Sequence, residues 1–84
     1  MTEKLHGDTE FLFKTILSLK DEKQCAAFFE DLCTFKEIEA MAQRLTAAKL
    51  LLAGETYERI TSETDISSAT LSRVSRCVKY GDGY

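Results

Sequence analysis

Basic and hydroxyl side chains recur at short intervals near the C-terminal end of the chain. Residues 67–79 read Ser-Ser-Ala-Thr-Leu-Ser-Arg-Val-Ser-Arg-Cys-Val-Lys, so Arg73, Arg76 and Lys79 follow one another at intervals of three. On a helix, residues at this spacing are neighbours on the surface. Arginine pairs bidentately with guanine, and hydroxyl groups meet phosphates or base edges. The pattern therefore favours contact with the major groove of DNA.

A solvated helix face is the alternative interpretation of these basic residues. The formal net charge of the chain is −3, which by itself argues against a nucleic-acid partner. The charge is unevenly distributed, however. Residues 1–65 hold 13 acidic and 8 basic residues, a charge of −5, whereas residues 66–84 hold 1 acidic and 3 basic residues, a charge of +2. A local basic segment on an acidic chain favours DNA binding with a moderate salt dependence.

Two short helices joined by a tight turn are expected around this segment. Thr56 is the predicted cap of the first helix, and Thr64-Asp65-Ile66 forms the turn. Aspartate at position 65 tolerates the left-handed backbone that such a turn can need. Ser67 is the predicted cap of the second helix, whose first turn would meet the bases.

The candidate DNA-binding residues lie at both helix starts and along the second helix. Thr56 would bind phosphate through the N-terminus of its helix. Lys79 would add a second phosphate contact, and Ser67 has a capping role in addition. The whole set is Thr56, Ser67, Ser68, Ala69, Thr70, Arg73, Arg76 and Lys79.

Three further helices are predicted upstream from cap residues and apolar spacing. Asp8 and Asp21 are the expected caps of the first two helices. Thr34 and Glu37 form a capping box that starts a long third helix, and Gly54 ends it. The side chains expected to face inward in the last two helices are Tyr57, Ile60, Leu71, Val74 and Val78.

The composition predicts a single all-α domain over residues 1–84. Proline is absent, and the chain has only 4 glycines. Residues 8–54 are expected to serve dimerisation and residues 55–80 to form the helix-turn-helix. Apolar residues cover more than half of the third helix around Leu50-Leu51-Leu52, which favours an interlocked homodimer. A compact monomer with a few exposed leucines is the alternative.

The remaining aromatic and sulfur-bearing residues are interpreted as structural. The five phenylalanines are expected in the core or a dimer interface: Phe11, Phe13, Phe28, Phe29 and Phe35. Cys25, Cys33 and Cys77 are expected to be buried and reduced, with a redox-sensing pair as the minor alternative. The Tyr-Gly-Asp-Gly-Tyr sequence at positions 80–84 indicates a frayed or cut end.

Several classes of protein are disfavoured by the sequence. One histidine, His6, and no CxxC pair argue against a metal site, and no cofactor motif is present. No nucleophile–base pair is visible, so an enzyme is not expected. No apolar run reaches membrane-spanning length and the N-terminus lacks a signal-peptide core, which predicts a cytoplasmic protein without membrane contact.

The long helix and the helix-turn-helix together resemble a known family. The run from Glu39 to Glu55, followed by the helix from Ser67 to Arg76, is similar to the Trp repressor-like family, and most of all to its YerC/YecD branch of regulators. The resemblance covers roughly residues 25–80. It implies an interlocked homodimer whose two reading helices enter successive major grooves of a near-palindromic site.

The resemblance also implies a possible effector pocket. In the Trp repressor, tryptophan is held by residues that match Thr34, Arg44 and Arg73 here. Val74 stands where that family member has glycine and would intrude on an indole ring, while Cys77 replaces a serine that receives the amino group. Tryptophan is therefore a doubtful ligand, and another small molecule stays open. A structural salt bridge is the alternative role of Arg44.

Two other functions remain as alternatives to a simple DNA-binding regulator. One is a protein–protein adaptor that uses the helix-turn-helix without DNA. The other is a repressor that binds DNA only when a small effector, different from tryptophan, lies between Arg44 and Arg73. Such an effector must bind the DNA-competent state preferentially.

Overall fold

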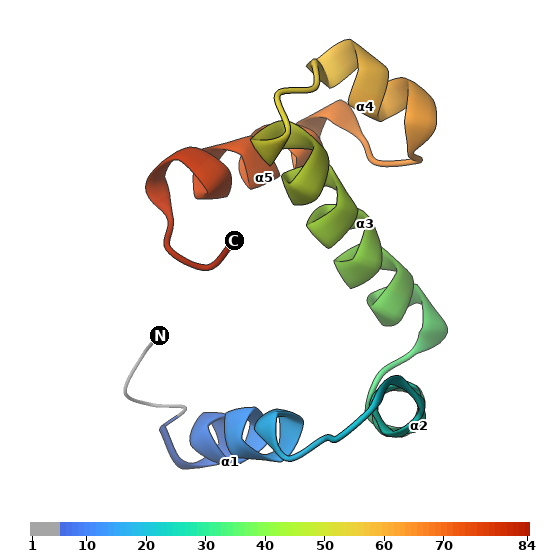
Figure 1. The fold of residues 1–84 in the computed structure, drawn as a ribbon, viewed down its shortest axis with the longest axis vertical. Coiled ribbons are helices and arrows are strands. Elements are labelled where there is room, and N and C mark those ends of the chain that lie inside the picture. The colour runs from blue at the N-terminus through green and yellow to red at the C-terminus, as the bar shows by residue number, and fades with distance from the viewer. Residues whose placement is uncertain (1–5) are drawn as a thin grey trace. The chain divides into compact units, whose positions relative to one another are not determined.

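The computed structural model describes residues 6–84, and within this range every regular element is an α-helix (Figure 1). The expected all-α, five-helix fold is confirmed. The helices are α1 (His6–Leu17), α2 (Glu22–Leu32), α3 (Phe35–Leu52), α4 (Tyr57–Glu63) and α5 (Ser68–Tyr80). None of these helices is both long and apolar enough to cross a membrane.

The chain divides into two compact units. The first ends at Thr34 and contains α1 and α2, and the second spans Phe35–Tyr84 and contains α3, α4 and α5. The long helix α3 therefore packs with the two C-terminal helices. Each unit is described separately below.

The first unit begins its two helices in different ways. The carboxylate of Asp21 accepts a hydrogen bond from the Gln24 backbone N–H at 2.8 Å, which confirms Asp21 as the cap of α2. The prediction for Asp8 is wrong, because α1 already begins at His6 and Asp8 lies in its first turn. An acidic residue there still interacts favourably with the helix dipole.

The first unit has no buried core among its described residues. No side chain between Gly7 and Thr34 is fully buried. The rings of Phe28 and Phe29 pack edge to face with centroids 5.3 Å apart and remain partly exposed. Large apolar side chains stand in solvent on α1, where Phe11 is 74% and Leu17 is 84% exposed.

The second unit is built on a small core shared by α3, α4 and α5. Ala47 and Ala48 on α3 have almost no exposed surface, and their small side chains allow α5 to approach closely. The other buried apolar residues are Ile60, Ile66, Leu71 and Val74, and Leu50, Leu51 and Val78 pack against this cluster. The predicted inward positions of Ile60, Leu71, Val74 and Val78 are thereby confirmed.

A glycine ends α3 as expected. Gly54 has φ +88°, a left-handed conformation that glycine adopts without steric cost. Its N–H donates to the Leu51 carbonyl at 3.0 Å, and the Glu55 N–H donates to the Leu50 carbonyl at 3.0 Å. These two bonds form a Schellman motif, which satisfies carbonyls at the end of the helix and redirects the chain into α4.

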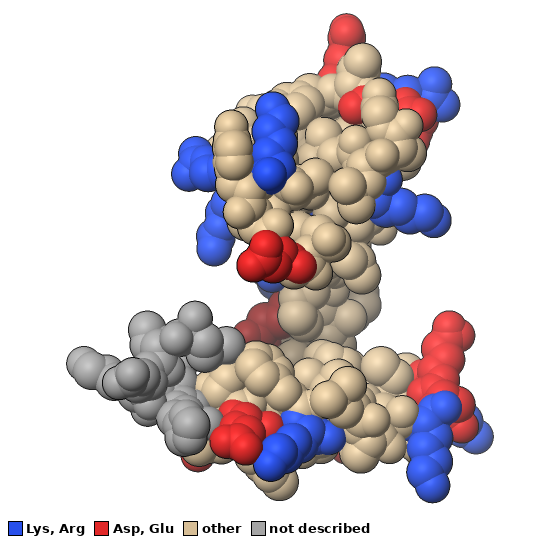
Figure 2. All heavy atoms as spheres, turned by 60° about the vertical axis from the view of Figure 1, so that its left-hand side comes forward, with Lys and Arg blue, Asp and Glu red and all other residues tan. Residues whose placement is uncertain are grey.

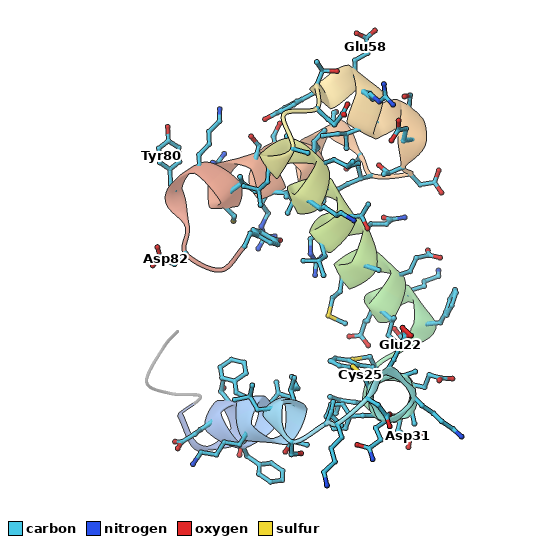
Figure 3. The ribbon with its side chains drawn as sticks, in the orientation of Figure 1. Glu22, Cys25, Asp31, Glu58, Tyr80 and Asp82 are labelled. Carbon is cyan, nitrogen blue, oxygen red and sulfur yellow. The ribbon has the colours of Figure 1, made fainter. Side chains whose placement is uncertain are left out.

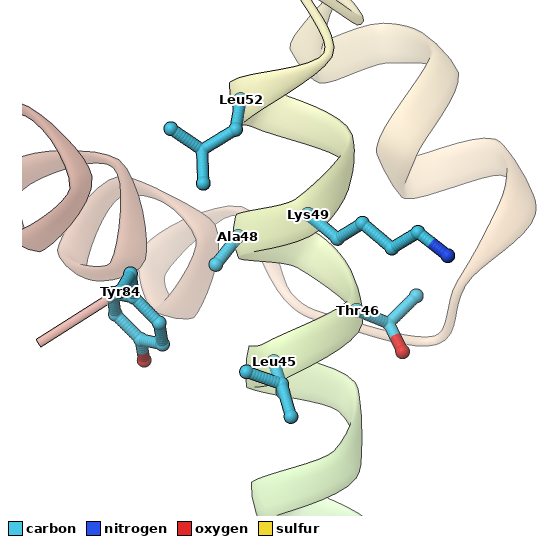
Figure 4. A pocket seen from close by; sticks show the side chains of 6 residues that line it. All are labelled: Leu45, Thr46, Ala48, Lys49, Leu52 and Tyr84. Carbon is cyan, nitrogen blue, oxygen red and sulfur yellow. The ribbon is translucent and has the colours of Figure 1, made fainter.

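Two expectations for single residues in the second unit are wrong. Tyr57 is 44% exposed, because its position in the first turn of α4 points away from the core that Ile60 enters. Cys77 is exposed on α5 instead of buried. The frayed or cut end expected at positions 80–84 stays a prediction; Tyr84 is 47% exposed and lines a pocket together with residues of α3 (Figure 4).

Candidate nucleic-acid interface

The N-terminus of α4 is fixed by a side-chain cap. The hydroxyl of Thr56 accepts a hydrogen bond from the Arg59 N–H at 3.2 Å, so the predicted cap is confirmed. Thr56 itself is exposed. The guanidinium of Arg59 pairs with Glu63 at 2.8 Å and Glu55 at 3.1 Å, so its charge is balanced locally. The N-terminus of α4 thus faces solvent on a helix that is anchored by the buried Ile60.

The turn between α4 and α5 is held by one hydroxyl group. Thr64 donates its Oγ1 hydrogen to the Ile60 carbonyl at 2.8 Å, and the same oxygen accepts from the Ile66 N–H at 3.4 Å. No residue other than glycine has a positive φ in the described part of the chain, so Asp65 does not adopt the left-handed conformation considered from the sequence. Threonine hydrogen bonding and the buried Ile66 shape the turn instead.

The N-terminus of α5 is capped by Ser67, as predicted. Its Oγ accepts a hydrogen bond from the Thr70 N–H at 3.2 Å and donates to the Thr70 Oγ1 at 2.9 Å. Both hydroxyl groups are therefore engaged with each other. Their arrangement positions the first turn of the helix, while the neighbouring Ser68 and Ala69 are exposed.

One face of α5 is buried and the opposite face is open. Leu71, Val74 and Ser75 point into the second unit. At 100° per residue, the helical positions farthest from them are those of Ala69, Arg73, Arg76 and Tyr80, and all of these are exposed. Figure 3 shows the Tyr80 side chain projecting outward from the helix. We call these four residues the outer face of α5.

The predicted basic residues take different places around this outer face. Arg73 and Arg76 lie on it, on either side of Ala69 and Tyr80 in angle. Lys79 lies on the flank beyond Arg76, and all three basic residues are exposed. The helix thus presents basic side chains over a wide arc.

One residue of the outer face was missed in the sequence analysis. Tyr80 lies on it and is 83% exposed. The helical period was enough to find it, since Tyr80 is four residues after Arg76.

The second unit carries both acidic and basic side chains, whereas the charged side chains of α5 are all basic. Figure 2 shows both Lys or Arg and Asp or Glu side chains on the surface of this unit. In sequence, however, α5 contains no acidic residue from Ser68 to Tyr80, and Lys79 lies in its last turn. The charge of such a helix is complementary to anions.

Two of the three expected effector residues meet at one cavity. Arg44 of α3 and Arg73 of α5 line a space of about 320 Å³ together with Val74, Cys77 and Tyr84. Thr34 belongs to the first unit, and its role in an effector site stays a prediction. Among residues 6–84, no group of three or more His, Cys, Asp or Glu side chains gathers in a way that could hold a metal ion.

The geometry defines the class of protein: a helix-turn-helix, formed by α4 and α5, carried on a long helix of an all-α chain. Sequence comparison then gives the family. The chain belongs to the Trp repressor protein family, which matches residues 8–84. The resemblance inferred from the sequence is therefore confirmed. This family consists of regulators rather than enzymes.

Individual relatives agree with this assignment. The uncharacterized protein YerC of Bacillus subtilis (strain 168) is 52% identical over 81 residues, which are 95% of this chain and 78% of YerC. The crystal structure of a TrpR-like protein from Eubacterium eligens has a TM-score of 0.90 at 45% identity, covering 96% of this chain and 84% of that one. A Staphylococcus aureus protein provisionally assigned as a Trp repressor has a TM-score of 0.89 at 44% identity, with 95% and 81% covered.

Proposed function

We propose that this protein is a sequence-specific, double-stranded-DNA-binding transcriptional regulator that acts as a homodimer in the cytoplasm. The observation that carries the proposal is the acid-free α5, which presents Ala69, Arg73 and Arg76 outward from a capped and anchored helix-turn-helix. A helix of this kind fits the major groove, where its exposed side chains can reach base edges.

Each candidate residue has a distinct role in this proposal. Ser68, Ala69 and Arg76 read base edges, and Arg73 contacts the flank of the groove. Thr56 and Lys79 bind phosphates, which fixes the register of the helix on DNA. Ser67 and Thr70 act mainly by positioning the first turn, because their hydroxyl groups already bond to each other at 2.9 Å.

The homodimer is supported by the apolar surface of the first unit. Phe11 and Leu17 are almost as exposed as they would be in an unfolded chain, and no residue between Gly7 and Thr34 is buried. Two helices without a core do not stay folded alone in water. We assign residues 8–54 to association between subunits and residues 55–80 to DNA. Two such reading helices, one turn of DNA apart, would recognise a near-palindromic site.

The test is an in vitro selection from randomised duplex DNA at moderate salt. The wild-type chain is compared with the double variant Arg73→Ala/Arg76→Ala and with Lys23→Ala, an exposed lysine on α2. We expect a near-palindromic consensus with half-sites one turn apart for the wild type and for Lys23→Ala. The Arg73→Ala/Arg76→Ala variant should select no consensus sequence.

If none of the three proteins enriches a DNA sequence, the proposal that the chain binds DNA without an effector is contradicted. The adaptor alternative then predicts that a protein partner is still captured by the Arg73→Ala/Arg76→Ala variant. Folded structure is verified for each variant by circular dichroism, so that loss of binding is separated from loss of fold.

A second candidate, effector-dependent DNA binding, is favoured by the cavity between Arg44 and Arg73. Its guanidinium groups suit a small anionic molecule other than tryptophan, since Val74, Cys77 and Tyr84 form the rest of the wall. Repeating the selection with small-molecule pools tests this function. A consensus that emerges only with a pool supports it, and an unchanged consensus contradicts it.

A further inference from the structure

Tyr80 is the last residue of α5 and lies on its outer face. At 100° per residue it falls between Arg73 and Arg76 in angle, opposite the buried side of the helix. Its side chain is 83% exposed and projects away from the helix (Figure 3). The hydroxyl makes no hydrogen bond within residues 6–84. The basic face of α5 therefore carries an uncharged hydrogen-bond donor that no described group of the chain uses.

The end of α5 gives this side chain a defined position. Gly81 caps the helix, and its N–H donates to the Cys77 carbonyl at 2.8 Å. A Cβ atom at position 81 would lie 2.7 Å from the same carbonyl oxygen, so a larger residue would shift this end of the chain. Asp82, the nearest acidic residue in sequence, follows the cap, and Figure 3 shows it away from the Tyr80 ring. No acidic residue of α5 itself repels an anion at Tyr80.

The length of α5 separates the two ends of its outer face on DNA. Tyr80 comes eleven residues after Ala69, which is roughly 16 Å along the helix axis. The major groove is only about 12 Å wide and winds around the duplex, so a straight helix leaves it over this length. When the first turn of the helix meets the base edges, the last turn therefore lies at the border of the groove. The groups at that border are phosphates, and tyrosine is one of the side chains that donate to them.

We propose that the Tyr80 hydroxyl donates a hydrogen bond to a backbone phosphate at the edge of the half-site, beyond the bases that Arg76 reads. This inference rests on the DNA binding proposed above and adds a contact that carries no charge. Lys79, one residue earlier, neutralises a phosphate and so releases a counterion, whereas Tyr80 releases none. The two neighbouring contacts therefore respond differently to salt.

The first test measures the affinity for the selected consensus duplex over a series of salt concentrations. We expect Tyr80→Phe, which loses only the hydroxyl, to bind about tenfold more weakly at every salt concentration, because it loses a hydrogen bond to a charged group. Lys79→Ala should instead reduce the slope of log Kd against log salt concentration by about 1. Lys23→Ala, the matched control on α2, should keep the slope of the wild type.

The second test locates the phosphate with methylphosphonate substitutions, each of which removes the charge of one phosphate. Substitution of the contacted phosphate should weaken binding of the wild type, and Tyr80→Phe should cause no further loss on that duplex. At all other phosphates the losses from the two changes should add.

The outcomes separate this contact from the proposed function. Wild-type affinity in Tyr80→Phe, or losses that add at every phosphate, would overturn the contact while leaving DNA binding by the chain intact. If the wild type itself selects no consensus, the proposed function fails and the Tyr80 contact fails with it.

Discussion

At the scale of single residues, the neighbouring hydroxyl groups of Ser67 and Ser68 have different roles at the start of α5. Ser67 uses its hydroxyl both to accept from the Thr70 N–H and to donate to the Thr70 Oγ1. Ser68, the next residue, is exposed and is no part of that cap. Ser67 therefore contributes to the stability of the helix, whereas Ser68 contributes to the chemistry of its surface.

Substitution of the cap should reduce stability. We expect Ser67→Ala to lower the free energy of unfolding by about 1 kcal/mol, because the N-terminus of α5 loses its hydrogen-bond acceptor. Ser68→Ala should change it by less than about 0.5 kcal/mol, as is usual for exposed surface substitutions. Urea denaturation of both variants measures this difference. Equal loss in the two variants would show that the cap contributes nothing specific.

Arg76 should matter for recognition rather than for folding. We expect Arg76→Ala to weaken binding to a selected consensus duplex by about 1–3 kcal/mol while leaving thermal stability unchanged. Fluorescence anisotropy with consensus and shuffled duplexes measures the change. Lys23→Ala makes the same change in net charge on α2 and should bind like the wild type. A similar loss for Lys23→Ala would instead indicate general electrostatic attraction.

Individual residues were predictable from sequence where local hydrogen bonding decides their role. Asp21, Thr56 and Ser67 cap their helices as expected, because a cap depends only on the next few backbone N–H groups. Tyr57 and Cys77 were placed wrongly, since both are apolar enough to be buried but lie on exposed sides of their helices. Which side of a helix is buried depends on tertiary packing and not on the local sequence.

At the scale of elements, the link between α3 and α4 depends on the Schellman motif at Gly54. Its φ of +88° is costly for any residue with a Cβ atom, although nothing lies within 4 Å of the place that this atom would take. The requirement is therefore conformational and not steric. It fixes the direction in which the chain enters α4.

Gly54 and Gly7, which both have open surroundings, should respond oppositely to substitution. We expect Gly54→Ala to destabilise the chain by about 1–2 kcal/mol, because alanine must adopt the left-handed conformation. Gly7→Ala, within α1, should be neutral or stabilise by up to about 1 kcal/mol, because alanine favours helix. Thermal unfolding of both variants tests this. A tolerated Gly54→Ala would contradict the role assigned to the cap.

Helices were more predictable than their ends and contacts. Apolar spacing and caps located all five helices, yet α1 begins before Asp8, because a helix can extend beyond a favourable acidic residue in its first turn. The outer face of α5 follows from the helical period once Leu71 and Val74 are known to be buried. The position of Tyr84, which lines a pocket together with residues of α3, has no local signal in the sequence.

At the scale of the whole molecule, the first unit presents apolar side chains that its own helices do not cover. Phe11, Leu17 and Leu32 are each more than half exposed. Their types were expected to be buried in a core or an interface. A sequence cannot distinguish these two places, because burial within a chain and burial between chains require the same residues.

A charge placed on this surface should prevent association. We expect wild-type chains to sediment as dimers, and Leu17→Glu to shift them to monomers with loss of helicity in the first unit. Sedimentation equilibrium with circular dichroism measures both. Lys23→Ala alters the net charge equally and should remain dimeric. A monomeric wild type, or a dimeric Leu17→Glu, would contradict the assignment of this surface to subunit contact.

The shared core of the second unit has a thermodynamic consequence. Because Ala47 and Ala48 of α3 are buried against Leu71 and Val74 of α5, neither helix keeps its packing when the other unfolds. A molecule that binds only the folded α5 therefore stabilises α3 by the same free energy. In an oligomer assembled through α3, binding of such a molecule at α5 raises the affinity between subunits. Association of the subunits then raises the affinity for that molecule by the same factor.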